Sequence, residues 1–539
     1  MITLTGTAAL TRLAFRRDRV MLISWIYALT AFVAATVYGF KKLYTTPALA
    51  QAFATTVAHN PSLVALYGPL FGRSLGSLVA WRDAAFGGVG FALMSIFLVV
   101  RHTRADEESG RLELVGSTAV GRHAALASAL LVACIANVAA GALITAAAIA
   151  LGLPAPGTLV MAAALVCCGL AFTGAAAVAA QVAQTGRSAR GLAAAALGVA
   201  YLLRAAGDSA GHGGPRWLTW LSPVGWNELN RAFGSVRPWV LALPLATAII
   251  LTVLGAVLAV RRDYDAGMLP QRPGPAAGAP GLRSPMALAW RLHRGSLIAW
   301  VAGALVYGVV IGAAAKGIGG LLTSSEVRKV IGNLGGQPIQ PGALRTALTN
   351  AYLAAIMSFS GLIAAGYAIS AVLRLHTEES DQRADAVLAT STGRISWGLS
   401  HVLIALAGTL VILVTIGLGA GLGYAYRGGG GAEIARLVGA GLAQAPAALV
   451  MAGIAAAFFG LAPRASVAGS WSALGVAVLM LFLGAILQLS HWVLDISPFQ
   501  HLPKLPGSAV NAPPYIWLSV IALALGAAGL AGLRRRDMA

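Results

Sequence analysis

The sequence has few charged residues and few cysteines. Asp, Glu, Lys and Arg make up 10% of its 539 residues, well below the roughly 25% usual for a soluble domain. This deficit excludes a soluble globular protein. Because 58% of the residues are hydrophobic, intrinsic disorder is excluded as well. The composition is typical of a polytopic helical membrane protein.

Motifs for metal, nucleotide and covalent chemistry are also missing. The three cysteines, Cys134, Cys167 and Cys168, lie within apolar stretches and have no metal-ligand spacing. The sequence contains no GxxxxGK[ST] loop and no HExxH motif. We therefore predict no catalytic residues, no metal site and no cofactor in this chain. Charged residues are nearly absent from the centres of the apolar stretches, so we expect the energy for any transport to enter from outside the bilayer.

Twelve stretches are long enough to cross a bilayer, which takes about 20 mostly apolar residues. Basic residues exceed acidic ones by 38 to 18, as expected for a membrane protein with a basic cytoplasmic rim. Arginines cluster before the first stretch and after the last, so an even number of spans predicts that both termini lie on the cytoplasmic side of a bacterial cell membrane. The predicted spans are 20–40, 81–101, 123–151, 157–182, 190–206, 238–260, 296–316, 349–374, 398–424, 435–462, 468–490 and 514–533.

The sequence is also an internal duplication. Leu13-Ala14-Phe15-Arg16 matches Leu288-Ala289-Trp290-Arg291, and two further motifs recur in the same order at nearly the same offset. Six spans per half is an even number, so both halves must share one orientation. We predict an all-α membrane protein of two parallel six-helix repeats, 1–262 and 284–539, joined by a Pro- and Gly-rich cytoplasmic linker at 263–283.

Basic amphipathic segments, 8–19 and 285–294, precede the first span of each half. Their apolar residues alternate with arginines at helical spacing, so they can lie at the inner membrane surface with the arginines toward phosphates. Plain flanks with snorkelling side chains are the alternative.

Acidic clusters follow the second span of each half, in the segments 101–122 and 374–396. Glu107-Glu108-Ser109 matches Glu378-Glu379-Ser380 on a side that is otherwise rich in arginine. His102 and His376 differ in register relative to these pairs, which argues against a metal site. A duplicated polar helix of mixed charge predicts a docking surface for a soluble partner; a solvated loop is the alternative.

Tryptophans and a Ser-Pro pair recur before the last span of each half, in the outer loops 207–236 and 491–513. Tryptophan at a membrane boundary usually anchors the chain. The alternative is a pair of segments that dip back as short helices and gate a central cavity. The candidate gate residues are Trp217, Trp220, Ser222, Pro223, Trp492, Ser497 and Pro498.

Glycines at 417, 419, 421 and 423 form overlapping GxxxG spacings in the ninth predicted span. Because glycine lets two helix backbones approach closely, this pattern predicts tight helix packing.

The order of these motifs resembles that of ABC exporter permeases of the type V kind. The two fused halves, with the Arg261-Arg262-Asp263-Tyr264-Asp265-Ala266-Gly267 segment between them, are most similar to the actinobacterial permeases that export polyketide antibiotics, the tetronasin-type group. The second half departs by one residue, with Asp381-Gln382 where the first has Gly110, so the two docking segments are expected to differ.

The resemblance implies a partner, a separate cytoplasmic ATPase that acts as two copies and binds ATP and Mg²⁺. The amphipathic segments would be elbow helices and the acidic segments coupling helices that insert into the ATPases. ATP binding would draw the halves together and open the route outward. The coupling candidates are Arg104, Glu107, Glu108, Arg111, Gly121 and Arg122, with Glu378, Glu379, Arg383, Gly393 and Arg394.

The resemblance also implies export of a hydrophobic or amphipathic compound, such as a drug, an antibiotic or a lipid, with no nucleic acid partner. We expect the second, fifth, eighth and eleventh spans to line the pathway. Met and aromatic side chains suit varied apolar ligands, although the same stripe is common in plain packing. The candidate lining residues are Phe91, Met94, Phe97, Met357 and Phe359.

Two other functions stay open. An ion-coupled secondary multidrug carrier can have the same twelve-span, two-half layout, and it predicts a charged residue near the middle of the bilayer. A membrane enzyme acting on lipid-linked substrates would need a boundary cluster of Asp, His or Arg.

Overall fold

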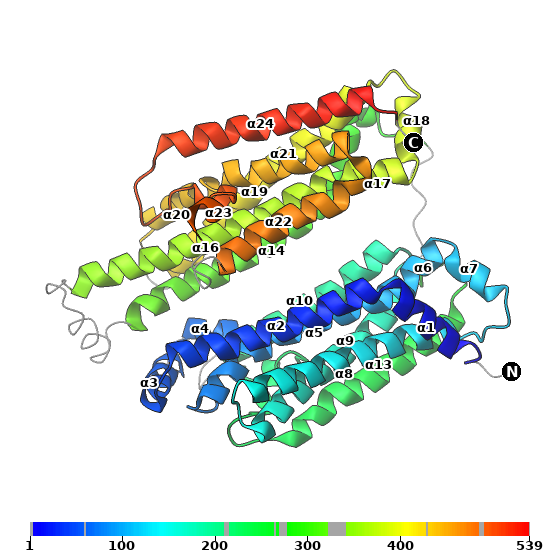
Figure 1. The fold of residues 1–539 in the computed structure, drawn as a ribbon. Helices are drawn as coiled ribbons and strands as arrows, with labels where there is room; N and C mark the ends of the chain where they lie inside the picture. Colours follow the sequence, from blue (N-terminus) through cyan, green and yellow to red (C-terminus); the bar gives the residue numbers. More distant parts are fainter. Residues whose placement is uncertain are drawn as a thin grey trace. The chain divides into compact units, whose positions relative to one another are not determined.

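A computed structural model describes residues 4–58, 61–209, 215–263, 266–268, 277–321, 341–426, 430–483 and 490–537. These residues contain helices and turns but no strand. Twelve helices among them are long and apolar enough to cross a membrane (Figure 1). The prediction of an all-α polytopic membrane protein is therefore confirmed.

Contacts divide the chain into two compact units, Met1–Gly274 and Pro275–Ala539. The long helices of the first unit run side by side in Figure 1, and short helices lie at their ends. They are α1 (Thr7–Arg17), α2 (Arg19–Leu43), α3 (Pro47–Ala58), α4 (Pro61–Tyr67), α5 (Leu75–His102), α6 (Arg104–Glu108), α7 (Arg111–Gly116), α8 (Ala124–Ala150), α9 (Ala155–Val182), α10 (Gly186–Ser209), α11 (Trp217–Trp220), α12 (Trp226–Leu229), η2 (Pro238–Leu241) and α13 (Ala242–Arg261).

The core of the first unit is built around α5 and α9. Helix α9 packs against α5, α8, α10 and α13, and α5 is among the most buried spans. The sequence of α9 is rich in Ala and Gly, and such small side chains let neighbouring helices approach closely. By contrast, little of α13 is buried, as expected for a helix that faces lipid.

The second unit is also built from long helices joined by short ones. They are η3 (Pro280–Leu282), α14 (Pro285–Leu321), α16 (Pro341–Val372), α17 (Arg374–Ser380), α18 (Arg383–Leu388), α19 (Arg394–Tyr426), α20 (Ala432–Leu442), α21 (Ala445–Leu461), η4 (Pro463–Ala465), α22 (Ser466–Leu483), α23 (His491–Leu494), η5 (Pro498–Gln500) and α24 (Ala512–Arg535). Helix α16 packs against α14, α19, α21 and α22, and α21 packs against α24.

The glycines of α19 lie where the sequence predicts close packing. A Cβ atom at Gly419 would lie 2.8 Å from the Leu305 carbonyl oxygen of α14, and one at Gly417 would lie 2.6 Å from the Leu437 carbonyl oxygen of α20. Backbone therefore meets backbone on two faces of α19, and the tight-packing prediction is confirmed. No larger residue fits there unless α14 or α20 moves away.

The structure adds detail to the predicted boundaries. The span predicted at 435–462 is present as Ala432–Leu461, but it is divided into α20 and α21, because Pro446 lies in the first turn of a new helix, where its missing N–H is tolerated. The interfacial segment predicted at 285–294 is not a separate helix but the start of α14. In the first unit Asp18 separates α1 from α2, whereas its counterpart in the second unit, His293, continues the helix.

Candidate functional site

A short helix–turn–helix follows the second span of each unit (Figure 1). We call the end of the unit where it lies the arginine-rich end, because several arginines gather there: Arg104, Arg111 and Arg262 in the first unit, and Arg374, Arg383 and Arg536 in the second. In the first unit it is α6 and α7, and Gly110 turns the chain between them with a φ of +71°. In the second unit it is α17 and α18, and Gln382 takes the left-handed position with a φ of +57°. The Asp381-Gln382 departure therefore preserves the turn, although a non-glycine residue rarely adopts it.

Glu107 ties α6 to the end of the last span of the first unit. Arg262, directly after α13, donates Nη1 to Oε1 and Nη2 to Oε2 of Glu107, both at 2.6 Å. Arg104 Nη1 lies 3.0 Å from Glu107 Oε2, and the fully buried Arg104 also donates Nε to the Gln184 carbonyl at 2.6 Å. A bidentate Arg–carboxylate pair of this kind fixes geometry as well as charge.

The second unit builds the same kind of attachment from different residues. Glu378 of α17 accepts from Arg374 Nε at 2.7 Å and from Arg383 Nε at 2.9 Å. Glu379 accepts from Arg536 Nη2 at 2.5 Å, and the Arg536 guanidinium stacks on Phe459. An arginine after the last span thus reaches a glutamate in both units, Glu107 in one and Glu379 in the other.

A third cluster ties the start of the first span to the second span. Arg101 donates Nε and Nη2 to the Asp18 carboxylate at 2.7 and 2.8 Å, and His102 Nε2 lies 3.0 Å from the same group. Burial opposes the charge of Asp18, but the hydrogen bonds and charge of Arg101, with His102 and Arg17, outweigh it and lower the pKa of this carboxyl. In the second unit His293, at the position of Asp18, is buried and lies 3.0 Å from His401 of α19, so this contact reaches the third span instead of the second.

Arg122 and Arg394 cap the last helix of their own units. Arg122 Nη2 donates to the Val260 carbonyl at 2.5 Å, and Arg394 Nη1 donates to the Arg536 carbonyl at 2.8 Å. These carbonyls lie at the C-terminal ends of α13 and α24, where helix carbonyls lack partners. Both arginines therefore have a structural contact inside the unit.

The coupling candidates named from the sequence are thus mostly engaged within the chain. Glu107 and Glu378 are buried, Glu379 is half-buried and ion-paired, and the exposed Glu108 accepts the Gly186 N–H at 2.9 Å. Arg111 pairs with Asp106 at 3.3 Å while most of its side chain stays exposed. Gly121 donates its N–H to the Thr5 carbonyl, and Gly393 is exposed.

The exposed surface lies instead on α7 and α18. No residue of α7 is buried, and Leu114 is 75% exposed. Glu113 of α7 and Asp385 of α18 are both exposed and align at an offset of 272, the same offset that aligns Arg111 with Arg383. Sequence reasoning missed this acidic pair because the doubled glutamates are the more conspicuous signal. Behind α7 lies a cavity of about 400 Å³, lined by residues that include Leu112, Val115 and Arg262.

Three of the candidate pathway residues are fully buried within their own unit. They are Phe91, Met94 and Met357, and in this structure they serve packing. Phe97 is exposed and stacks on Trp25 of α2 with ring centroids 6.1 Å apart. Phe359 is half-buried against the core of the second unit.

The tryptophans and the Ser-Pro pair of each loop before the last span lie in different surroundings in the structure. Trp217 and Trp492 are strongly exposed, as expected for anchors at a membrane boundary. The Ser-Pro pairs instead face inward: Ser222 donates to the Ala200 carbonyl at 2.6 Å, and Ser497 and Pro498 are buried. Trp220 stacks on Trp239, and Pro223 is half-buried.

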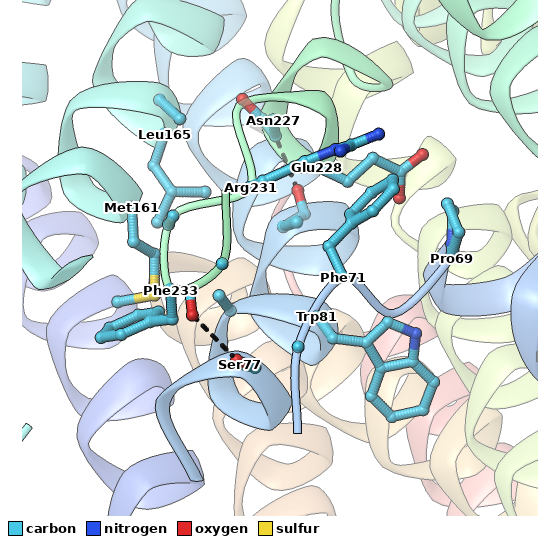
Figure 2. A pocket seen from close by; sticks show the side chains of 16 residues that line it. Pro69, Phe71, Ser77, Trp81, Met161, Leu165, Asn227, Glu228, Arg231 and Phe233 are labelled. Carbon is cyan, nitrogen blue, oxygen red and sulfur yellow. Dashed lines mark hydrogen bonds between the residues drawn. The ribbon is translucent and has the colours of Figure 1, made fainter. Parts of the chain in front are cut away.

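Helix α12 dips back into the first unit (Figure 2). It packs against α5 and α9, and Asn227 Nδ2 donates to the Ala84 carbonyl of α5 at 3.1 Å. The cavity beside it has a volume of about 30 Å³, room for a water molecule but not for a drug. Helix α12 therefore leaves little free space at this end of the unit.

Glu228 of α12 is buried in a mixed-charge cluster. Its Oε2 lies 3.6 Å from Arg204 Nη1, which lies 3.8 Å from Asp208 Oδ2. Burial raises the pKa of Glu228 well above its ordinary value, against the charge of Arg204 and with the support of Asp208. Arg204 also donates to the Leu66 carbonyl at 2.9 Å, so three separate segments meet at this cluster.

Contrary to expectation, the acidic side chain of Asp83 is buried inside a span. Asp83 is fully buried in α5, and its polar neighbours are Thr36 of α2 and Arg82. The predicted span 81–101 places Asp83 at the membrane boundary. Helix α5 begins at Leu75, so the residue lies about 12 Å along the helix, at 1.5 Å per residue.

Comparison with known proteins identifies similar sequences over nearly the whole chain. The family model described as the multidrug efflux system permease Rv1217c, C-terminal domain, matches residues 8–259 and 282–534. A multidrug efflux system permease protein, Rv1217c of Mycobacterium tuberculosis, is 40% identical over 538 residues, which cover 99% of this chain and 95% of that protein.

Replacing Glu107 by Gln should destabilise the protein, because Arg104 and Arg262 would keep their charges without a carboxylate. We expect a loss of about 3 kcal/mol in the free energy of unfolding. The matched control is Glu108→Gln, whose amide oxygen can still accept the Gly186 N–H. Thermal unfolding in detergent should separate the two variants, and equal melting temperatures would contradict the ion-pair account.

Glu228 should make stability depend on pH. Because its folded pKa is raised, the folded state binds an extra proton from about pH 4.5, the ordinary glutamate value, up to the raised pKa, and stability falls as pH rises through this window. Glu228→Gln should abolish that part of the slope. Thermal unfolding at stepped pH tests this, with Glu433→Gln as the control; an unchanged slope in the Glu228 variant would refute it.

Proposed function

The chain belongs to the family of the multidrug efflux permease Rv1217c, and on that basis we propose that it is the transmembrane subunit of an ATP-driven exporter whose energy comes from a separate cytoplasmic ATPase. The partner would bind ATP and Mg²⁺, and this chain would supply the route across the membrane. Under this proposal the arginine-rich end of each unit is cytoplasmic, as are both termini.

The proposal rests on the way in which α7 and α18 are attached to their units and exposed to solvent. Each is a short helix with an exposed face, and an Arg–Glu contact holds the short helix before it, α6 or α17, to the unit. Helix α7 buries no residue, whereas α18 also packs Ala384, Val387 and Leu388 on the core of its unit. A solvated loop would need no such attachment. A firmly held helix with a free face suits insertion into a groove on another protein.

Force applied to α7 would reach several spans at once. Helix α6 continues directly from α5, Arg262 connects Glu107 to the end of α13, and Asp18 connects Arg101 to the start of α2. These charged contacts resist separation because each would leave a charge without its partner in a largely buried setting. Movement of a docked ATPase would therefore shift the ends of α2, α5 and α13 together.

The second unit has a similarly attached short helix, α18. This similarity favours two ATPase copies, one for each unit. There Glu378 connects α17 to the first residue of α18, and Glu379 connects α17 to Arg536 at the end of α24. Because the residues differ between the units, the two docking steps need not be equivalent.

The cargo we propose is a hydrophobic or amphipathic compound, with polyketide-type antibiotics as one candidate class. Support comes from the multidrug efflux role of the relative and from the apolar composition of the twelve spans. Phe91, Met94 and Met357 could contact cargo only after helices of their own unit separate, because all three are fully buried. Helix α12 would have to move in the same step.

Asp83 favours a second candidate, an ion-coupled secondary carrier. An acidic residue buried within a membrane span is costly and often marks a proton or cation pathway. Among the described residues Asp83 forms no ion pair, and its counterpart positions in the second unit, 354 and 358, are Ala and Ser. The two candidates differ in what drives transport, so they can be separated directly.

Replacing the exposed Leu114 by Asp should weaken ATPase docking by about tenfold, since one buried leucine contributes about 1.5–3 kcal/mol. Cargo-stimulated ATP hydrolysis should fall in parallel, and the permease should still insert and fold. Val510→Asp, a similarly exposed residue in the loop before α24, is the control. Wild-type docking and turnover in the Leu114 variant would argue against α7 as the coupling helix.

Asp83→Asn decides between ATP-driven and ion-coupled transport. In the ATP-driven account, cargo efflux from vesicles holding the complex requires ATP, and the Asn variant stays within about twofold of wild type because it keeps shape and burial. Asp495→Asn, in an exposed outer position, is the control. Efflux driven by a proton gradient without the ATPase, and lost in the Asp83 variant, would establish the ion-coupled carrier.

A further inference from the structure

A basic groove lies between α1 and the α8 helix of the first unit. Helix α1 is seated on α8, where Thr11 Oγ1 donates to Ser128 Oγ at 3.2 Å. The groove has a volume of about 920 Å³. It is lined by Ala8, Thr11, Arg12, Phe15, Arg16, Arg19 and Leu131.

The three arginines of the groove have no counter-charge in the part of the chain that the structure describes. Arg12, Arg16 and Arg19 are exposed and form no ion pair there, and no carboxylate lines the groove. Neighbouring Asp18 is buried and turned to Arg101 and His102. Like charges four residues apart on a helix repel one another, so an anion between Arg12 and Arg16 would be favourable.

The floor of the groove is apolar, and apolar residues continue along the exposed surface of α8. Leu131, Ile135 and Val138 are 45%, 47% and 56% exposed. Their spacing of four and three residues places them on one face of the helix. A soluble anion would gain nothing from such a stripe, whereas a molecule with an anionic head and an apolar tail would match both parts.

We propose that this groove binds one anionic phospholipid, with its phosphate among Arg12, Arg16 and Arg19 and an acyl chain along Leu131, Ile135 and Val138. Three unpaired cations select an anionic lipid over a zwitterionic one. The site belongs to the first unit, because the second has Ala287 at the position of Arg12 and continues directly into α14.

The bound lipid would hold α1 in place next to the charged attachments of the coupling segment. Arg17, the last residue of α1, donates Nη1 to Asp106 of α6 at 2.9 Å. Lipid binding would therefore help to fix the position of α6 through this Arg17–Asp106 contact. This site does not depend on the identity of the partner that supplies energy.

The test uses the purified full chain in neutral detergent and follows its melting temperature against dioleoyl-phosphatidylglycerol, dioleoyl-phosphatidylcholine and inorganic phosphate. We expect saturable stabilisation by phosphatidylglycerol alone. Arg12→Gln with Arg16→Gln should raise the lipid concentration needed by about tenfold or more. The matched control, Arg534→Gln with Arg535→Gln, removes the same charge from another exposed helix end and should leave the titration unchanged.

If both double variants lost affinity for phosphatidylglycerol equally, the lipid would be attracted diffusely to basic residues and the site would be overturned. Equal stabilisation of the wild-type chain by inorganic phosphate would overturn it as well. Wild-type affinity in the Arg12 and Arg16 variant would overturn it too. If that variant does not fold, a photoreactive phosphatidylglycerol on the wild-type chain decides the question. Labelled peptides from residues 8–19 and around Leu131 support the groove, and labelling confined to other helices refutes it.

Discussion

The pairing of buried charge at the arginine-rich end of each unit is the constraint on which the rest of the structure depends. A carboxylate or guanidinium removed from water must meet a partner, and removal of one partner costs several kcal/mol. In the first unit Asp18 and Glu107 each meet an arginine from another segment, and in the second Glu379 does so. These ion pairs join helix ends that belong to different segments of the chain.

The two units meet this constraint with different residues. Glu107 is held by Arg262 and Arg104, whereas the aligned Glu378 is held by Arg374 and Arg383, and the arginine after the last span shifts to Glu379. At the junction before the first span an aspartate with an arginine partner is replaced by a histidine pair. Only the first unit keeps a separate α1, and with it the groove with three unpaired arginines. The duplicated architecture therefore leaves room for unequal roles.

Much of the fold could be predicted from sequence because membrane helices follow from runs of apolar residues alone. The GxxxG spacing of the glycines in α19 also predicted its close packing. The break before α21 could have been predicted from Pro446, yet the apolar run hides it. The hydropathy pattern predicted a start at residue 81 for α5, which begins at Leu75, because Trp81-Arg82-Asp83 interrupts the apolar stretch. For the same reason it placed Asp83 at the membrane boundary and not inside the span. The doubled glutamates marked the right segment, but whether each side chain faces an arginine or solvent depends on tertiary contacts from Arg262 and Arg536, more than 150 residues away.

The central claim is that a soluble ATPase docks on α7 and α18, and that these ion pairs hold the two short helices to their units. Hydrogen–deuterium exchange of the chain, alone and with its cognate ATPase, measures this most directly. The account predicts that bound ATPase slows amide exchange in residues 111–120 and 383–393 and leaves the loops around Trp217 and Trp492 unchanged. Protection elsewhere, with both short helices exchanging as in the free chain, would contradict it.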